Sequence, residues 1–198
     1  MRAPSLKEFS YEGPKDGGVA TPRMRRPQAP ADYLNIISRA VFSAGLSWKF
    51  IDDRWERFEE VFEGFDVVKV ASFDGATIDR IAETPGLLRS RKKVAATVNN
   101  ARALVAIEAE HGSIRSWLDA FPSYAAAAAD VGKRFKYLGK TFGAYYLLYI
   151  AGAKVPDFPT FEEWSKATGE VHPRMRELVA ANENREVGAL PKRMPRRR

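Results

Sequence analysis

Apolar residues recur every three to four positions between residues 32 and 181, which is the spacing of a buried helix face. No segment shows the apolar and polar alternation that a half-buried strand requires. The sequence therefore predicts an all-α fold. In the first half of the chain, helices are expected from Asp32, which caps the first, to Gly45, and from Phe50 to Phe62, ended by Gly64, with a short one around Ile78 that ends at Pro85. A long helix is expected from Val94 to Gly112, followed by a helical turn capped by Ser113. The span from Leu138 to Ala151 predicts another helix, and 160–168 and 173–181 predict weaker ones.

Three regions are expected along the chain. Residues 1–31 contain five prolines and three glycines, a composition that predicts an extended arm. Residues 32–185 are expected to form one helical domain. Residues 186–198 form a basic tail that cannot bury apolar area, so disorder is expected there.

The formal net charge of +7 is concentrated at the two ends of the chain. The last eight residues carry +5 and residues 1–31 carry +3, which leaves about −1 for residues 32–190. A basic tail attracts phosphate without reading sequence, and this attraction weakens with salt. The alternative is that the tail only solubilises the chain.

The composition also excludes several classes of protein and site. There is no cysteine, so disulfides, thiolate metal sites and a cysteine nucleophile are excluded. No apolar run suits a signal peptide or a membrane span. We therefore expect a soluble protein of the cytoplasm, associated with the nucleoid if it binds DNA.

One basic segment combines a tight turn with the start of a helix, over residues 135–146. Free amides at a helix N-terminus favour a phosphate oxygen, and nearby cations add to this. The pattern is typical of a helix-hairpin-helix element that grips the DNA backbone, although an ordinary interhelical turn remains the alternative. The candidate phosphate contacts are Lys133, Arg134, Lys136, Gly139, Lys140 and Thr141.

A second basic cluster precedes the long helix predicted from Val94. Cations in the first turn of a helix oppose its dipole unless an anion shares the site, which favours a phosphate contact. A solvated helix face is the alternative. The candidate contacts are Arg89, Arg91 and Lys93, with Lys92 between them.

Residues 44–48 place a glycine, a leucine and a tryptophan close together. Gly45 permits a sharp turn, and an exposed Leu46 beside it would suit a wedge between stacked bases. The flat face of Trp48 can stack on a flipped base or attract a cationic one. The alternative is that Leu46 and Trp48 belong to the hydrophobic core.

Taken in order, these segments resemble the DNA-3-methyladenine glycosylase I family from about Tyr33 to Ala153. Five short motifs in similar order and spacing carry the resemblance. They are Ala44-Gly45-Leu46-Ser47-Trp48, matching AGLSW; Phe65-Asp66 with Val70-Ala71; Arg89-Ser90-Arg91-Lys92-Lys93; Asn100-Ala101-Arg102; and Phe135 to Gly139 followed by Thr141 and Tyr145.

The resemblance implies a two-lobed helix-hairpin-helix fold that clamps double-stranded DNA containing a damaged base. It further implies a monomeric glycosylase of base excision repair that hydrolyses the glycosidic bond of a base such as 3-methyladenine, without a cofactor. Gly45 and Leu46 would enter the base stack, and residues 136–141 would bind phosphates. Phe42, Ser43, Ser47 and Trp48 would line the base pocket.

The sequence departs from the family at several positions. Ala40 stands where the family has a pocket glutamate, and Ser43 stands where a glutamine is usual. The family also joins its termini through a zinc site of Cys and His, whereas residues 1–31 contain neither. No structural zinc is therefore expected.

The family resemblance also directs attention to carboxylates. An aspartate near the position of Asp157 stabilises the sugar cation in the wider superfamily, so Asp157 is the candidate catalytic residue, with capping of a proline-rich loop as the alternative. Asp52 and Asp53 are interpreted as part of a solvated helix face. Three functions remain open: a DNA glycosylase, a catalytically silent DNA-binding relative, and a module that binds a protein partner.

Overall fold

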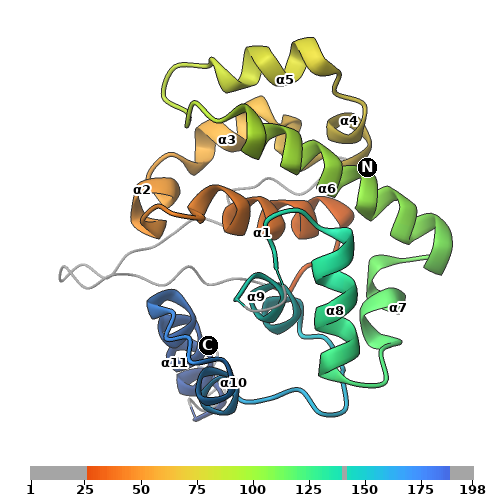
Figure 1. The fold of residues 1–198 in the computed structure, drawn as a ribbon, viewed down its shortest axis with the longest axis vertical. Coiled ribbons are helices and arrows are strands. Elements are labelled where there is room, and N and C mark those ends of the chain that lie inside the picture. The colour runs from red at the N-terminus through yellow and green to blue at the C-terminus, as the bar shows by residue number, and fades with distance from the viewer. Residues whose placement is uncertain (1–25, 140–141, 188–198) are drawn as a thin grey trace, which may run out of the picture.

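The computed structural model describes residues 26–139 and 142–187, with only the backbone described beyond residue 180. Every regular element in these two ranges is helical, so the all-α prediction is confirmed (Figure 1). The helices are α1 (Pro30–Ser43), α2 (Trp48–Asp52), α3 (Trp55–Val61), a short 3-10 turn η2 (Glu63–Phe65), α4 (Val67–Ala71), α5 (Gly75–Ala82), α6 (Arg91–His111), α7 (Ile114–Asp119), α8 (Tyr124–Arg134), α9 (Phe142–Ala151), α10 (Phe161–Thr168) and α11 (Pro173–Val187).

Helix α1 begins two residues before the predicted cap. Pro30 occupies the start of the helix, where its missing N–H costs nothing. Asp32 lies in the first turn, and its carboxylate accepts from the backbone amides of Gln28 at 2.7 Å and Ala29 at 2.9 Å. Asp32 therefore does stabilise the helix start, but from inside the helix, and Pro30 belongs to the domain rather than to the arm.

The prediction of a single helix from Phe50 to Phe62 is wrong, because the chain turns at Asp53 and Arg54 and forms α2 and α3 instead. Gly64 has a φ of 64° within the turn that follows α3. Helix α4 was not predicted, although Asp66 supplies its cap by accepting from the amides of Val68 and Lys69 at 3.1 and 3.0 Å.

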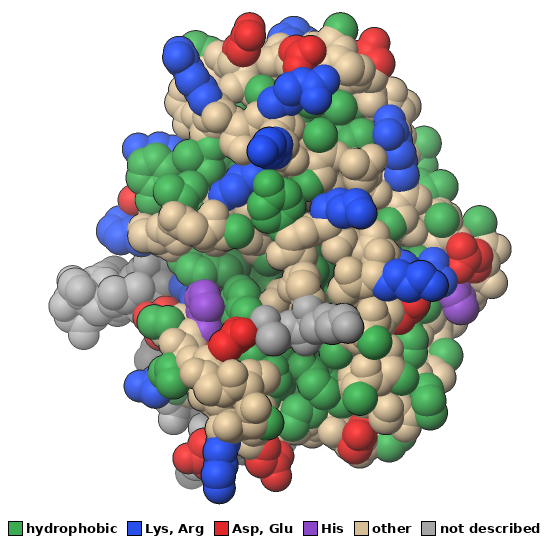
Figure 2. Space-filling view, in the orientation of Figure 1, with side chains coloured by type: hydrophobic (Ala, Val, Ile, Leu, Met, Phe, Trp, Pro, Cys, Tyr) green, Lys and Arg blue, Asp and Glu red, His purple; other side chains and the backbone are tan. Residues whose placement is uncertain are grey.

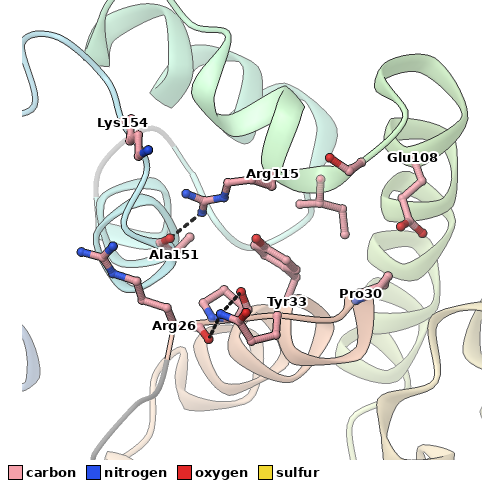
Figure 3. A pocket seen from close by; sticks show the side chains of 11 residues that line it. Arg26, Pro30, Tyr33, Glu108, Arg115, Ala151 and Lys154 are labelled. Atoms are coloured by element: carbon pink, nitrogen blue, oxygen red, sulfur yellow. Dashed lines mark hydrogen bonds between the residues drawn. The ribbon is translucent and has the colours of Figure 1, made fainter. Parts of the chain in front are cut away.

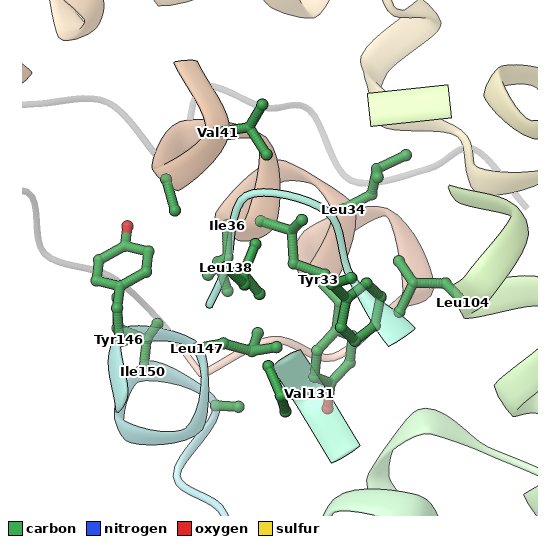
Figure 4. Packing of buried hydrophobic residues seen from close by; sticks show 14 of the residues in the cluster. Tyr33, Leu34, Ile36, Val41, Leu104, Val131, Leu138, Tyr146, Leu147 and Ile150 are labelled. Carbon is green, nitrogen blue, oxygen red and sulfur yellow. The ribbon is translucent and has the colours of Figure 1, made fainter. Parts of the chain in front are cut away.

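Helix α1 passes between two groups of helices, with α3 to α6 on one side and α8 to α11 on the other (Figure 1). One face of α1 packs on α6 and another on α9. Figure 4 shows the second contact, in which apolar side chains of α1 meet Leu138, Leu147 and Ile150. Burial on both sides makes α1 the element that fixes the relative position of the two groups.

Several predicted helix ends are confirmed by cap geometry. Gly112 ends α6 with a φ of 76°, and the Ser113 hydroxyl accepts from the Ser116 amide at the start of α7. Among the described residues α9 starts at Phe142, and Leu138 lies outside it, because the φ values of 67° at Tyr137 and 60° at Gly139 are incompatible with a right-handed helix there. Helix α10 agrees with the predicted segment at 160–168, and α11 extends beyond 181.

Most of the predicted arm and tail, residues 1–25 and 188–198, lies outside the described residues. Within the described part, no helix has both the length and the apolar character needed to cross a bilayer.

Candidate functional site

The loop between α1 and α2 presents an apolar side chain at the surface. Gly45 turns the chain there with a φ of 77°, and Leu46 follows with 40% of its surface exposed. The Ser47 hydroxyl accepts from the Phe50 amide at 3.0 Å and caps α2, so Ser47 has a structural role at this position. The exposure of Leu46 is incompatible with the core alternative for this residue and leaves it available as a wedge.

Trp48, the first residue of α2, is half-buried against aromatic side chains from distant parts of the chain. Its ring centroid lies 5.2 Å from that of Tyr146, 6.1 Å from Phe142 and 6.2 Å from His172. Phe142 and His172 stack on one another at 3.7 Å. Helix α9 and the residue before α11 thus surround Trp48, and we call Trp48, Phe142, Tyr146 and His172 the aromatic cluster.

Charged side chains lie directly beside the aromatic cluster. The guanidinium carbon of Arg174 lies 5.6 Å from the Trp48 ring centroid, and its Nη2 donates to Asp52 Oδ2 at 3.1 Å. Arg39 Nη1 donates to the other oxygen of Asp52. The interpretation of Asp52 as part of a solvated face is therefore wrong, because it is largely buried between two arginines.

Some buried polar atoms of this region have no hydrogen-bond partner among the described residues. They include His172 Nδ1 and Arg174 Nε. Burial lowers the pKa of His172, which favours the neutral ring, and burial raises the pKa of Tyr146. Unpaired polar atoms beside a half-buried tryptophan are what a site for a polar, planar ligand would contain.

One of the predicted pocket residues packs in the core rather than against the aromatic cluster. Phe42 is 1% exposed, and its ring packs at 4.5 Å from Phe58 and 5.8 Å from Phe62. It is therefore a core residue, and the prediction that it lines the pocket is corrected. Ser43 is buried, and its hydroxyl has no partner among the described residues.

Lys93 holds the end of α1 and the loop that follows it. Its ammonium donates to the backbone carbonyls of Phe42 at 2.9 Å and Ala44 at 2.7 Å. These carbonyls belong to the end of α1, where the helix dipole favours a cation. The predicted phosphate contact of Lys93 is corrected accordingly, because its side chain anchors the loop that carries Gly45 and Leu46.

Two other predicted phosphate contacts are engaged in ion pairs. Arg91 pairs with Asp79 at 2.5 Å, and Arg134 pairs with Glu110 at 2.9 Å and Asp130 at 2.8 Å. Arg134 therefore links α6 and α8 rather than pointing freely to solvent. The remaining predicted cations in the described ranges, Arg89, Lys133 and Lys136, are exposed, while Lys140 and Thr141 lie outside the described residues.

The turn between α8 and α9 is held by a buried side-chain amide, a role that the spacing of residues alone does not indicate. Asn100, 0% exposed in α6, accepts from the Lys136 amide at 2.7 Å and donates to the Lys136 carbonyl at 3.1 Å. Arg102 binds the backbone carbonyls of Ala71 and Phe73 at 2.9 and 3.1 Å. The Asn-Ala-Arg motif could have indicated this role. Asn100 connects α6 to the turn between α8 and α9, and Arg102 connects α6 to the end of α4.

Asp157 is not brought to the aromatic cluster by any described contact. Its Oδ1 accepts from the Tyr124 amide at 2.5 Å, at the start of α8. It also lies exposed in the loop between α9 and α10. The structure thus supports the capping alternative for Asp157 and gives its catalytic assignment no geometric support.

Basic side chains are spread over one face of the molecule. In Figure 2, Lys and Arg lie across the part formed by α3, α5 and α6, whereas Asp and Glu lie mostly toward the edges. The same view shows a hollow with hydrophobic side chains at its floor, between the region of α1 and α2 and that of α10 and α11. The shape and charge of this face suit a polyanion that places a planar group in the hollow.

A separate cavity of about 350 Å³ lies between the start of α1, α7 and the end of α9 (Figure 3). Arg115 lines this cavity, but its guanidinium donates to the carbonyls of Ala151 at 2.5 Å and Gly152 at 3.0 Å. The Arg115 side chain therefore caps the C-terminus of α9. The described residues contain no group of three or more His, Asp or Glu that could hold a metal, and the full sequence has no Cys. The described part of the chain therefore does not fit a zinc site.

Comparison with known proteins places these features in a family. The model of the methyladenine glycosylase family matches residues 30–140. Over 65 residues the chain is 37% identical to DNA-3-methyladenine glycosylase 1 of Escherichia coli and 40% identical to DNA-3-methyladenine glycosylase of Haemophilus influenzae. These matches cover 33% of this chain and about a third (35%) of each relative.

The fold is also similar to solved structures. The 3-methyladenine DNA glycosylase I of Staphylococcus aureus is 25% identical with a TM-score of 0.57, and the match covers 69% of this chain and 87% of that one. A substituted 3-methyladenine DNA glycosylase I in complex with 3-methyladenine is 27% identical with a TM-score of 0.56, covering 69% and 88%.

Proposed function

The chain belongs to the methyladenine glycosylase family, and we propose that it is a DNA glycosylase that removes an alkylated base, such as 3-methyladenine, from double-stranded DNA. The observation that carries this proposal is that Leu46 is exposed and that Trp48, two residues later, is half-buried. A protein that only grips the DNA backbone has no use for a wedge next to a stacking surface.

The proposed reaction follows from base flipping. Leu46 fills the gap in the base stack while the damaged base turns out and stacks on Trp48. The bond between the base nitrogen and C1′ then breaks, its electron pair stays with the base, and water adds to C1′ and loses a proton. A base alkylated on a ring nitrogen carries positive charge, so it leaves as a neutral molecule and needs no strong general acid.

The DNA backbone would be bound by the turn between α8 and α9, as a helix-hairpin-helix element. Lys133 is exposed in the last turn of α8, and Lys136 and Gly139 are exposed in the turn itself. Lys140 and Thr141 follow them in sequence and lie outside the described residues. Arg89 would add a contact from the region before α6. Such contacts bind any sequence, which suits a monomeric enzyme that searches the DNA of the nucleoid in the cytoplasm.

A catalytically silent DNA-binding relative is the second candidate, favoured by Ala40. This residue is 6% exposed in α1 and replaces the glutamate of the family. To separate the two functions, a duplex with one alkylated base is incubated with excess protein and then treated with hot alkali, which cleaves abasic sites. We expect strand cleavage at the lesion. Salt-sensitive binding without cleavage would identify the silent relative.

Replacing Lys93 with methionine is expected to slow base release about tenfold, because the loop that carries Leu46 loses its anchor. Duplex affinity at several salt concentrations separates this role from phosphate binding. Loss of one phosphate contact lowers the salt slope by about 1, whereas Lys93→Met should leave it unchanged. Lys92→Met, at an exposed neighbouring position, is the matched control and should not affect release.

Replacing Asp157 with asparagine is expected to destabilise the fold by about 1 kcal/mol, the usual cost of weakening a helix cap. The rate of base release from alkylated duplex should not change when the protein is fully folded. Thermal unfolding and single-turnover release provide the two readouts. A large loss of release without loss of stability would restore Asp157 as the catalytic residue.

A further inference from the structure

Trp48 and Asp52 lie on the same face of α2, because they are four residues apart in a helix. The Asp52 side chain is 17% exposed and the Trp48 ring is half-buried. A carboxylate at the edge of an aromatic face is a combination that attracts a planar cation, since the ring quadrupole and the carboxylate both favour positive charge.

A planar cation already occupies that position in the structure. The guanidinium of Arg174 lies 5.6 Å from the Trp48 ring centroid and donates to Asp52 Oδ2 at 3.1 Å. Guanidinium and a purine alkylated on a ring nitrogen share three properties: a flat shape, delocalised positive charge and N–H donors at one edge. Arg174 therefore marks where such a base would bind.

The position of Arg174 is not optimal for an arginine. It lies in the first turn of α11, where the helix dipole disfavours a cation. Its Nε is buried without a hydrogen-bond partner among the described residues. Glu177, 38% exposed and 3.6 Å from Nη1, provides a second acceptor near solvent. These features reduce the free energy needed to move the guanidinium away from Asp52.

The other groups around the site permit an exchange of one cation for another. Arg39 pairs with Asp52 Oδ1 and would remain in place. Burial lowers the pKa of His172 and raises the pKa of Tyr146, so neither ring brings a charge to the aromatic cluster near neutral pH. Replacing Arg174 with a cationic base therefore leaves the local charge unchanged.

We propose that Trp48 and Asp52 form the recognition subsite for a cationic alkylated purine and that Arg174 is the cation which the base displaces. The proposal rests on the proposed glycosylase function and deepens it. Asp52 would supply from α2 a negative charge that the uncharged Ala40 cannot supply from α1.

The test compares three variants in single-turnover release of 3-methyladenine from methylated duplex DNA. Asp52→Asn should slow release about tenfold to a hundredfold, which is the effect of losing one hydrogen bond to a charged group. Arg174→Gln should release the base at least as fast as the parent protein, because the competing cation is gone and Arg39 still pairs with Asp52. Asp53→Asn, at an exposed neighbouring position paired with Lys49, is the control and should not change the rate.

The opposite effects of Asp52→Asn and Arg174→Gln distinguish recognition from a structural ion pair. If the pair only stabilised the fold, both variants would slow release and lower the unfolding temperature together, and the proposal would be overturned. An Asp52→Asn variant as fast as Asp53→Asn would overturn it as well. Release by the parent in either case would leave the glycosylase function standing, whereas no release by the parent would remove both.

Discussion

Replacing Trp48 with alanine is expected to slow base release from alkylated duplex by about tenfold to a hundredfold. The size follows from the loss of one base-stacking contact, which is worth roughly 1–3 kcal/mol. The indole is only half-buried, so its removal leaves the hydrophobic core largely intact. The variant should therefore fold and bind undamaged duplex with nearly the affinity of the parent.

Phe50→Ala provides the matched control for Trp48→Ala. Phe50 lies on the same helix and is 38% exposed, but its ring contacts the Arg54 guanidinium rather than the aromatic cluster. Single-turnover release and duplex binding are measured for both variants. Equal rates for Trp48→Ala and Phe50→Ala would show that the aromatic cluster does not hold the base.

Replacing Gly143 with alanine is expected to destabilise the fold by about 3 kcal/mol, near the upper limit for overpacking. A Cβ at this position would lie 2.0 Å from the Leu138 carbonyl oxygen and 2.4 Å from its Cα. Because both atoms belong to the backbone, the turn between α8 and α9 must move. Duplex affinity should fall with stability, since this turn carries the proposed phosphate contacts.

Gly139→Ala separates steric from conformational effects in the same turn. Gly139 has a φ of 60°, but a Cβ there would meet nothing within 4 Å. The cost should be only about 1–2 kcal/mol, from the left-handed backbone alone. Chemical denaturation of both variants measures the difference. A Gly143→Ala variant no less stable than Gly139→Ala would contradict the close approach of α9 to Leu138.

The helical class and several helix ends could be predicted because they depend on local signals. The spacing of apolar residues and the caps at Gly112 and Ser113 act over one or two turns, and the structure contains them as expected. The break between α2 and α3 was missed because apolar spacing continues across it. The burial of Asp52 was missed for another reason, because sequence spacing does not show that Arg39 and Arg174 pair with it.

The charged part of the site could not be predicted, because it depends on contacts between distant segments. Arg174 and Asp52 are 122 residues apart in sequence, and neither lies in a motif with the other. The sequence predicts a phosphate contact for Lys93 because it does not show that two backbone carbonyls at the end of α1 lie within reach of the ammonium. Leu46 and Trp48, by contrast, belong to one short motif, and their roles could be proposed directly.

The most direct test of the proposed function is chromatography of the free bases released from methylated duplex DNA by excess parent protein. We predict release of 3-methyladenine well above the spontaneous rate, with the DNA strand left intact until alkali is added. Release no faster than in buffer alone, from duplex that the protein demonstrably binds, would contradict the account.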